Sequence, residues 1–294
     1  MRCQRWRERR DSYRPVGEVI DPSALGVERV EEREARPFVE RHHYSGSYPA
    51  ARLAVGLYRA RRWFVPELVG VAVFSVPCQG ASIPAWLGVE PAHGVELGRF
   101  VLLDDVAANG ETFFLSRALS VLKATLPEVR AVLSYSDPLP RASVDGRVTC
   151  AGHVGTIYQA ANAAYLGRSS PRWLYLDRDG RTVSERALSK IRNGERGWEG
   201  AARGLDAAGA PARHFGEEPA AWLARVLASG AFRRVQHPGN HAYALRGIDA
   251  CPVHPARAAL LSALVHKAHE IHEDEDECAC FPEYPKQSAR PLHI

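Results

Sequence analysis

Two segments of the sequence concentrate side chains that can ionise or donate hydrogen bonds. The first is His42-His43-Tyr44-Ser45-Gly46-Ser47-Tyr48, and the second runs from Tyr135-Ser136-Asp137 to Gly152-His153-Val154-Gly155-Thr156-Ile157-Tyr158. Both fall at predicted strand or helix ends, which is where ligands bind on an α/β scaffold. Asp137 alone could be a turn residue and His153 a helix cap. The two segments together therefore predict an active site more strongly than any one residue does.

A third segment, Ala107 to Thr112, is a loop of small residues that leads from a predicted strand directly into a predicted helix. Such a loop presents unpaired backbone N–H groups and the positive end of a helix to a pyrophosphate. The pattern is weak by itself, because most loops of this kind bind no phosphate.

The elements that position these segments follow from the spacing of apolar residues. A helix is predicted from Pro37 to His43, since proline is tolerated in a first turn and Ser45-Gly46 ends the pattern. Apolar runs predict strands of a core sheet over residues 52–58, 68–76, 97–103 and 129–135. The second run is nearly continuously apolar, as a strand buried on both faces would be.

Helices and turns are predicted between and after these strands. Leucines at helical spacing predict a helix from Gly110 to the residue before Pro127. After a loop from Pro138 to Ala151, a second helix is predicted over 154–167, with Tyr158, Asn162 and Tyr165 on one face.

The last part of the sequence predicts a hairpin, further helices and one more strand. Asp177-Arg178-Asp179-Gly180 is a strong turn signal between residues 173–176 and 181–184. Helices are predicted over 185–192 and 219–229, separated by linkers rich in glycine and alanine, and a final strand over 241–246.

The charge distribution favours a polyanionic partner. The 294 residues carry a net charge of +4, although six acidic residues lie near the C-terminus, so the remainder carries +10. A basic body suits nucleic acid, because cationic side chains neutralise phosphates and release counterions. The alternative is that the arginine content reflects a GC-rich genome.

Two function classes are disfavoured by composition. No apolar stretch has the length of a signal peptide core or a membrane span, so we expect a cytoplasmic protein without a membrane partner. Six cysteines at irregular spacing in a chain of this size predict reduced thiols and no disulfide framework.

Four stretches between residues 30 and 180 resemble the Mom family of DNA-modifying proteins from bacteriophages and prophages. They are His43-Tyr44-Ser45-Gly46, Leu97-Gly98-Arg99-Phe100, Phe113-Phe114-Leu115-Ser116-Arg117-Ala118-Leu119, and Ser134-Tyr135-Ser136-Asp137 leading to Gly152-His153-Val154-Gly155-Thr156-Ile157-Tyr158-Gln159-Ala160. The resemblance implies an α/β (α+β) fold like that of GNAT acyltransferases, with a mixed central sheet that is splayed near its middle and flanked by helices. We expect a basic arm over 1–26, the catalytic domain over 27–250 with a helical insertion at about 185–230, and a tail rich in histidine and acidic residues over 251–294.

The resemblance also implies a reaction and its cofactors. The family adds a carbamoylmethyl (acetamido) group to N6 of adenine in double-stranded DNA, which protects phage or prophage DNA from restriction in the bacterial host. Iron is expected on His43, Tyr44, Asp137 and Tyr158, and acetyl-CoA on the loop formed by Ala108, Asn109, Gly110, Glu111 and Thr112. Arg99, Ser116 and Ser120 complete the expected catalytic residues, together with Asp137 and Tyr158.

These residue types agree with the chemistry of that reaction. Nitrogen and oxygen donors suit iron in an open site, whereas structural zinc favours thiolates. The adenine N6 lone pair is delocalised into the ring, so it needs a metal or a base such as Asp137. The base must also leave the duplex stack, and Tyr48 or Tyr165 could stack on it. A basic surface for the duplex is expected from the N-terminal arm and from Arg168, Arg172, Arg178, Arg181, Arg186, Lys190 and Arg192.

The sequence departs from the family pattern in two places. The acetyl-CoA loop contains one glycine only, and residues 138–151 lengthen the connection after Asp137, so this residue stays in the site only if the segment loops outward. Two alternatives remain: an N-acetyltransferase that acts on a small molecule or a protein, and a non-catalytic DNA-binding protein. In the tail, His254, His266, His269, His272, Cys278 and Cys280 fit either a zinc site or a solvated segment, and their spacing matches no standard zinc finger.

Overall fold

The computed structural model describes residues 19–61 and 64–245. The chain separates into a compact unit of residues 1–254 and a second unit of residues 255–294. The possible zinc ligands of the tail and most of the expected basic arm lie outside the described residues.

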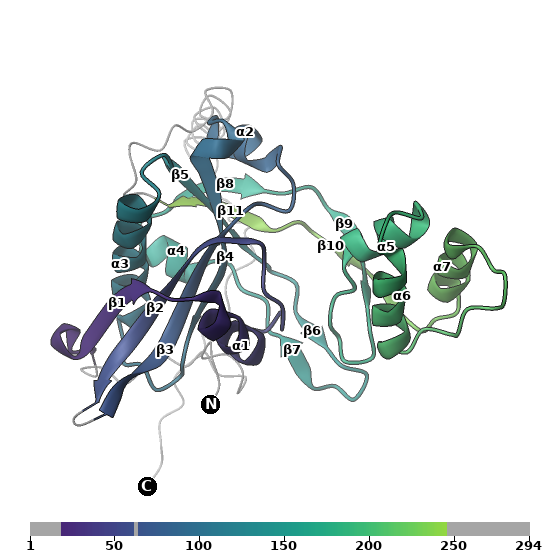
Figure 1. The fold of residues 1–294 in the computed structure, drawn as a ribbon, viewed down its shortest axis with the longest axis horizontal. Coiled ribbons are helices and arrows are strands. Elements are labelled where there is room, and N and C mark those ends of the chain that lie inside the picture. The colour runs from purple at the N-terminus through teal and green to yellow at the C-terminus, as the bar shows by residue number, and fades with distance from the viewer. Residues whose placement is uncertain (1–18, 62–63, 246–294) are drawn as a thin grey trace, which may run out of the picture. The chain divides into compact units, whose positions relative to one another are not determined.

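A seven-stranded sheet forms the centre of the fold (Figure 1). Its strands lie in the order β1-β2-β3-β4-β5-β11-β8, and every neighbouring pair is antiparallel except β4 and β5. The mixed sheet confirms the predicted α/β class. The strands are β1 (Leu25–Arg29), β2 (Ala51–Arg61), β3 (Phe64–Ser75), β4 (Gly94–Leu102), β5 (Ala131–Ser136), β8 (Ala164–Arg168) and β11 (His241–Leu245).

Helices cover both faces of this sheet, as the continuously apolar β3 predicts. Val71 and Val73 of β3 pack in the cluster that contains α1 (Glu32–His42), whereas Ala72 and Phe74 pack in the cluster that contains α3 (Gly110–Thr125). Successive side chains of a strand point to opposite faces, so one strand serves both clusters. The short helix α2 (Ser82–Leu87) packs against β5, β8 and β11, and α4 (Thr156–Ala160) joins the α3 cluster.

The parallel strands β4 and β5 separate near the middle of the sheet. They pair only from Gly94↔Ala131 to Glu96↔Leu133, although β4 continues to Leu102 and β5 to Ser136. This is where the resemblance places the splay. The opening lets side chains from the two faces of the sheet approach each other.

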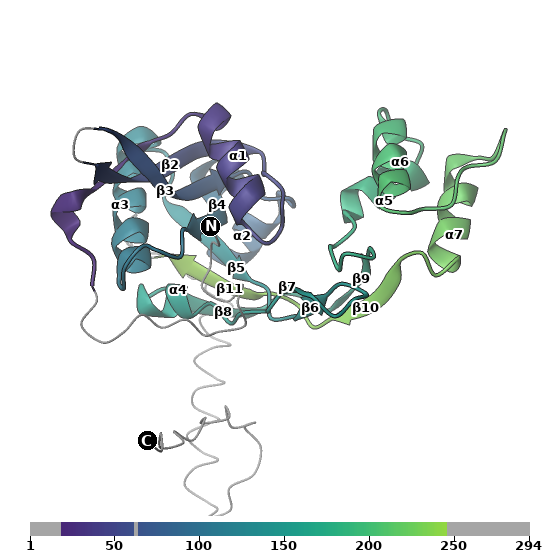
Figure 2. The same cartoon turned by 90° about the horizontal axis from the view of Figure 1, so that it is seen from below.

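Two smaller sheets lie beyond the end of β5. One is the hairpin of β6 (Arg141–Ala142) and β7 (Val148–Cys150), and the other is the antiparallel ribbon of β9 (Arg172–Leu176) and β10 (Arg233–His237). The two lie side by side in Figures 1 and 2, and Val144 N–H donates to the Arg178 carbonyl across them at 2.9 Å.

Three helices separate β9 from β10 in the sequence: α5 (Glu185–Arg192), α6 (Trp198–Ala207) and α7 (Pro219–Ala228). They have a core of their own, which includes the fully buried Ile191, Trp222 and Val226. The helix α6 occupies a stretch that the sequence predicted to be a linker, so that prediction was wrong. Alanines on one face of α6 were sufficient, because they pack against larger residues of α5 and α7.

The predicted helix over 154–167 was also wrong. The helix α4 ends at Ala160, Asn162 adopts a left-handed conformation with φ 55°, and the chain continues as strand β8. The left-handed residue breaks the helix, and β8 gains hydrogen bonds from β11 that a longer helix would forgo. Tyr158 and Tyr165 therefore do not share a helical face.

Two local predictions need smaller corrections, and a third needs an addition. The helix α1 begins at Glu32, so Pro37 lies inside it and not in its first turn. The predicted hairpin around the turn at residues 177–180 forms, since the Val183 N–H donates to the Tyr175 carbonyl and Leu176 bridges Thr182. The strand β9 pairs in addition with β10, which the sequence did not predict. The strand β1 starts within the predicted arm.

The remaining predicted strands and the helix from Gly110 are confirmed. Cys78 and Cys150 are free thiols, as expected. Over residues 19–61 and 64–245, no helix is long and apolar enough to cross a membrane.

Candidate functional site

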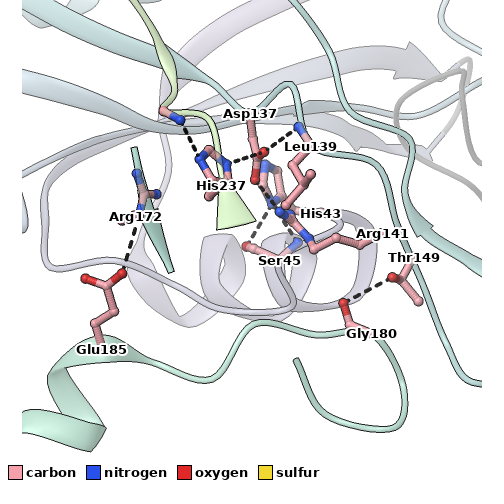
Figure 3. A network of polar contacts seen from close by, with 11 residues as sticks. His43, Ser45, Asp137, Leu139, Arg141, Thr149, Arg172, Gly180, Glu185 and His237 are labelled. Carbon is pink, nitrogen blue, oxygen red and sulfur yellow. Dashed lines mark hydrogen bonds and ion pairs between the residues drawn. The ribbon is translucent and has the colours of Figure 1, made fainter. Parts of the chain in front are cut away.

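Asp137 follows β5 and holds three hydrogen-bond donors (Figure 3). Its Oδ1 accepts from the Leu139 N–H at 3.0 Å and from His237 Nε2 at 2.9 Å, and its Oδ2 accepts from Arg141 Nη1 at 2.5 Å. The Gly239 N–H donates to Nδ1 of the fully buried His237, so Nε2 carries the proton that His237 donates.

These partners decide the ionisation of Asp137. Burial by itself would raise the pKa of its carboxyl, but the hydrogen bond from His237 and the charge of Arg141 outweigh burial and hold the pKa well below the ordinary value. Asp137 is thus an anion at neutral pH and a weak base. Its geometry is that of a residue that positions Arg141 and His237.

The extension over residues 138–151 loops outward as the β6–β7 hairpin and returns to its starting point. The His153 N–H donates to the Asp137 carbonyl at 2.8 Å, which closes the loop. Gly152 has φ 74°, and a Cβ there would lie 2.6 Å from the Pro138 carbonyl oxygen. Because residues 138–151 loop outward, they do not displace Asp137 from the other candidate residues. The extension also supplies two site residues, Arg141 and the buried Cys150.

His43 and Tyr44 approach the same place from the C-terminal end of α1. The His43 N–H caps the helix by donating to the Val39 carbonyl at 2.8 Å, and its Nδ1 lies 2.9 Å from Ser45 Oγ. The His43 and Tyr44 rings lie 4.2 Å apart. Burial and the nearby Cys150 and Asp137 raise the pKa of Tyr44 well above its ordinary value, so its hydroxyl keeps its proton at neutral pH.

Tyr158 arrives from α4, on the opposite face of the sheet. It is buried, its ring lies 5.3 Å from that of Tyr243, and burial raises its pKa to about 12. A phenolate at Tyr158 would further raise the pKa of Tyr44, so the two side chains lie near each other. Tyr44 follows α1 and Tyr158 packs in the α3 cluster on the other face of the sheet, so we infer that they approach each other at the opening between β4 and β5.

Arg99 of β4 fixes the loop that follows α1. Its Nε donates to the Ser47 carbonyl and its Nη2 to Ser47 Oγ, both at 2.9 Å. A planar guanidinium that makes two such bonds sets the direction of the loop, which lysine cannot do in the same way. Arg99 therefore positions the His43 to Ser47 segment.

Glu96 is a site residue that the sequence reasoning missed. It is the last β4 residue paired with β5, so it lies where the strands separate. Burial raises the pKa of its carboxyl to about 7, and the charge of Arg99 opposes this shift. The signal was present, because Glu96 is the one acidic residue in a strand that is otherwise mostly apolar.

Ser116 and Ser120 lie on the exposed side of α3, and the Ser120 hydroxyl donates to the Ser116 carbonyl at 3.2 Å. The structure thus does not bring them to the Asp137 cluster. Of the two tyrosines expected to stack on a base, Tyr48 packs in the α1 cluster under the Arg36 guanidinium. Tyr165 of β8 is 45% exposed, and its hydroxyl lies 3.0 Å from His241 Nδ1.

The expected acetyl-CoA loop does not fit a pyrophosphate in this arrangement. The Gly110 N–H donates to the Ala107 carbonyl, and the Ala108 carbonyl accepts from the Ile20 N–H. Glu111 places a negative charge in the first turn of α3, where the phosphates would lie. Ala108, Asn109 and Thr112 complete the loop, with Asn109 in a left-handed conformation.

The expected iron ligands fit a metal in their atom types and proximity but not in the pairing of Asp137. His43, Tyr44, Asp137 and Tyr158 offer nitrogen and oxygen donors, yet both carboxylate oxygens accept hydrogen bonds from Arg141, His237 and Leu139. In the described part of the chain, no group of three or more histidine, cysteine, aspartate or glutamate residues has metal-binding geometry.

Comparisons with known proteins place most of this cluster within one family region. A model described as the Mom protein family matches residues 24–208. "Methylcarbamoylase mom" of Escherichia phage Mu is 29% identical over 178 residues, which are 59% of this chain and 66% of that protein, slightly less than two thirds of its length. Tyr44, Glu96, Arg99, Asp137 and Tyr158 lie inside the matched range, whereas His237 lies beyond it.

The close approach at Gly152 predicts a specific loss of stability. Gly146 and Gly152 both have positive φ, but a Cβ at Gly146 would meet nothing within 4 Å. We expect Gly146→Ala to cost about 1 kcal/mol through backbone strain, and Gly152→Ala to cost on the order of 2–4 kcal/mol because it also displaces the 138–152 loop. Urea unfolding of the two variants measures this difference, and equal losses would contradict the close approach.

The raised pKa of Glu96 predicts a pH-dependent effect on stability. The folded-state pKa of about 7 exceeds the ordinary value of 4.5, so the folded protein binds this proton more tightly and loses stability as pH rises through this window. Glu96→Gln should therefore raise the melting temperature at pH 8, by an equivalent of at most about 3 kcal/mol, and have little effect at pH 4.5. The exposed Glu28→Gln is the control for the loss of one charge. A Glu96→Gln effect that is the same at both pH values would refute the assignment.

Proposed function

Because this chain belongs to the Mom protein family, we propose that it is an enzyme that transfers a carbamoylmethyl group to N6 of adenine in double-stranded DNA. The observation that carries the proposal is that Tyr44 lies near Asp137 and Tyr158, and Glu96 near Tyr158, within the matched range. The name of the phage Mu relative supports the choice of transferred group. In this proposal, the modification shields the DNA from restriction in the bacterial cytoplasm.

The reaction needs a proton acceptor that works near neutral pH. Transfer forms a bond between adenine N6 and a carbon of the donor, and breaks the bond from that carbon to the donor's leaving group, which departs with the electron pair. One N6 proton must then pass to a base. A base is most effective when its pKa lies near the operating pH, which Glu96 satisfies at about 7 and Asp137 does not. We therefore assign to Glu96 the role that the sequence suggested for Asp137.

The other residues of the cluster hold or polarise the reactants. Tyr44 and Tyr158 keep their protons at neutral pH, so their hydroxyls can donate hydrogen bonds to the adenine ring or to the donor. Asp137 keeps Arg141 in place beside them, and Arg99 holds the loop that carries Tyr44. Iron, held by His43, Tyr44, Asp137 and Tyr158, would supply Lewis-acid activation of the donor when bound.

Nucleoside mass spectrometry of plasmid DNA from expressing cells tests the proposed function. We expect a modified deoxyadenosine that carries the carbamoylmethyl group, and a decrease in its rate of formation of about 100-fold or more in Glu96→Gln. The rate should rise as pH increases through about 7, because Glu96 must lose its proton to act as a base. Arg130→Gln, at the far end of β5, is the control.

Two outcomes would contradict this proposal. Soluble wild-type protein that leaves only unmodified deoxyadenosine would contradict DNA modification. If the same protein acetylates a small molecule or a protein, the acetyltransferase alternative takes its place, and if it only binds duplex DNA, the non-catalytic alternative does.

Metal analysis of purified protein tests the proposed iron. We expect bound iron in the wild type and its loss in Tyr44→Phe, which removes one oxygen donor. Arg141→Ala should retain or raise the iron content, because the guanidinium competes with a cation for Asp137. Iron content that is the same in Tyr44→Phe as in the wild type would place the metal elsewhere.

A further inference from the structure

We propose that the β9–β10 ribbon is a docking surface for duplex DNA that holds the phosphate backbone beside the active site. The inference rests on the proposed function, because DNA is the substrate assumed there. It assigns a surface that is separate from the catalytic cluster, and it is carried by the ribbon's charge, its exposed aromatic side chain and its connection to Asp137.

The ribbon is basic and has two different faces. Its strands, Arg172-Trp173-Leu174-Tyr175-Leu176 and Arg233-Arg234-Val235-Gln236-His237, contain three arginines and no acidic residue. Leu174, Leu176 and His237 are buried on the inner face. The register pairs Trp173 with Gln236 and Tyr175 with Arg234, which places these four side chains on the other face. Tyr175 packs against the core of the three helices, so the exposed part of this outer face is formed by Trp173, Arg234 and Gln236.

The outer face carries an aromatic platform with a cation on it. Trp173 is 50% exposed, and the Arg234 guanidinium lies 4.0 Å from the centre of its ring. Trp173 belongs to no buried cluster in the described part of the chain, and no acidic side chain described there pairs with Arg234. An arginine stacked on an exposed tryptophan is the arrangement that binds phosphates and stacks on sugars or bases.

The inner face of the same ribbon is bonded to the catalytic cluster. His237 donates to Asp137 at 2.9 Å (Figure 3). Arg233 Nη2 donates to the Ala142 carbonyl of β6 at 3.1 Å. The outer face is therefore separated from Asp137 by the thickness of one ribbon.

The shape and surroundings of the ribbon favour a duplex as its occupant. A two-stranded antiparallel ribbon has dimensions that the major groove of B-DNA admits. The exposed Arg168 precedes β9 and extends the basic surface. Arg172 contributes less, because it pairs with Glu185 at 3.4 Å. Strand β9, which carries Trp173, lies inside the family match, and β10, which carries Arg234, lies beyond its end.

Salt-dependent binding of a duplex oligonucleotide tests the ribbon directly. For Arg234→Gln, we expect the slope of log affinity against log salt to fall by about 0.9, the value for one lost phosphate contact. Trp173→Ala should weaken binding by about tenfold through lost stacking. Arg234→Lys keeps the charge and should retain the slope, whereas Arg130→Gln, which removes an exposed arginine roughly 20 Å along β5, should change neither quantity.

Adenine modification, measured in the same variants, distinguishes a failure of the docking surface from a failure of the proposed function. If wild-type protein modifies DNA and the ribbon variants bind and modify it as Arg130→Gln does, the docking surface is wrong and the enzyme remains. If wild-type protein modifies no DNA, whereas Arg234→Gln still lowers the slope of log affinity against log salt, the docking surface stands and the proposed reaction is wrong. Melting temperatures equal to that of the wild type show that the variants are folded, and Arg234→Lys serves as the folded comparison if Arg234→Gln is not.

Discussion

The charge of Asp137 is the constraint that organises the end of the sheet. A partly buried carboxylate needs donors, and the donors that it finds come from three places: the backbone after β5, Arg141 in the hairpin, and His237 in the ribbon. Removal of one partner would leave a poorly solvated charge, which costs several kcal/mol. The buried network thus fixes the hairpin and the ribbon against β5, and it does so at the point where the chain leaves the sheet.

The opening between β4 and β5 is the second feature on which the site depends. Once the parallel pairing stops after Glu96 and Leu133, the space between the strands admits side chains from both faces. Tyr44 enters from the α1 face and Tyr158 from the α3 face. The same place leaves Glu96 poorly solvated and raises its pKa to about 7. Glu96 thus lowers the stability of the fold at neutral pH, but its raised pKa suits it to act as a base, as in many enzyme sites.

The extension over residues 138–151 and the strand β10 connect the catalytic cluster to a surface. The extension contributes Arg141 from within the matched range, and β10 contributes His237 from beyond its end, so both side-chain partners of Asp137 come from segments outside the seven-stranded sheet. One face of the ribbon contacts the catalytic cluster, and part of the other face is exposed. A segment that supplies both a buried partner and a basic surface can change how the substrate is held without changing the residues at the opening.

The local sequence determined most strands, the helix α3 and several of the residues that meet at the site, because hydrophobic periodicity and clustered polar side chains are local properties. Prediction from the local sequence failed where contacts between residues far apart in the chain determine the structure. Residues 161–168 have a helical pattern, yet they form β8 because β11, far along the chain, offers an edge to pair with. Residues 172–176 form the predicted hairpin with residues 181–183 but also pair with β10, which lies far along the chain. Asp137 was identifiable from sequence, but its weak basicity was not, because Arg141 and His237 become its partners only through folding. The sequence by itself thus named Tyr44, Asp137 and Tyr158 as candidates but not Glu96, Arg141 or His237. The tertiary structure decided the ionisation of Glu96 and Asp137, since a pKa depends on what surrounds a group in space.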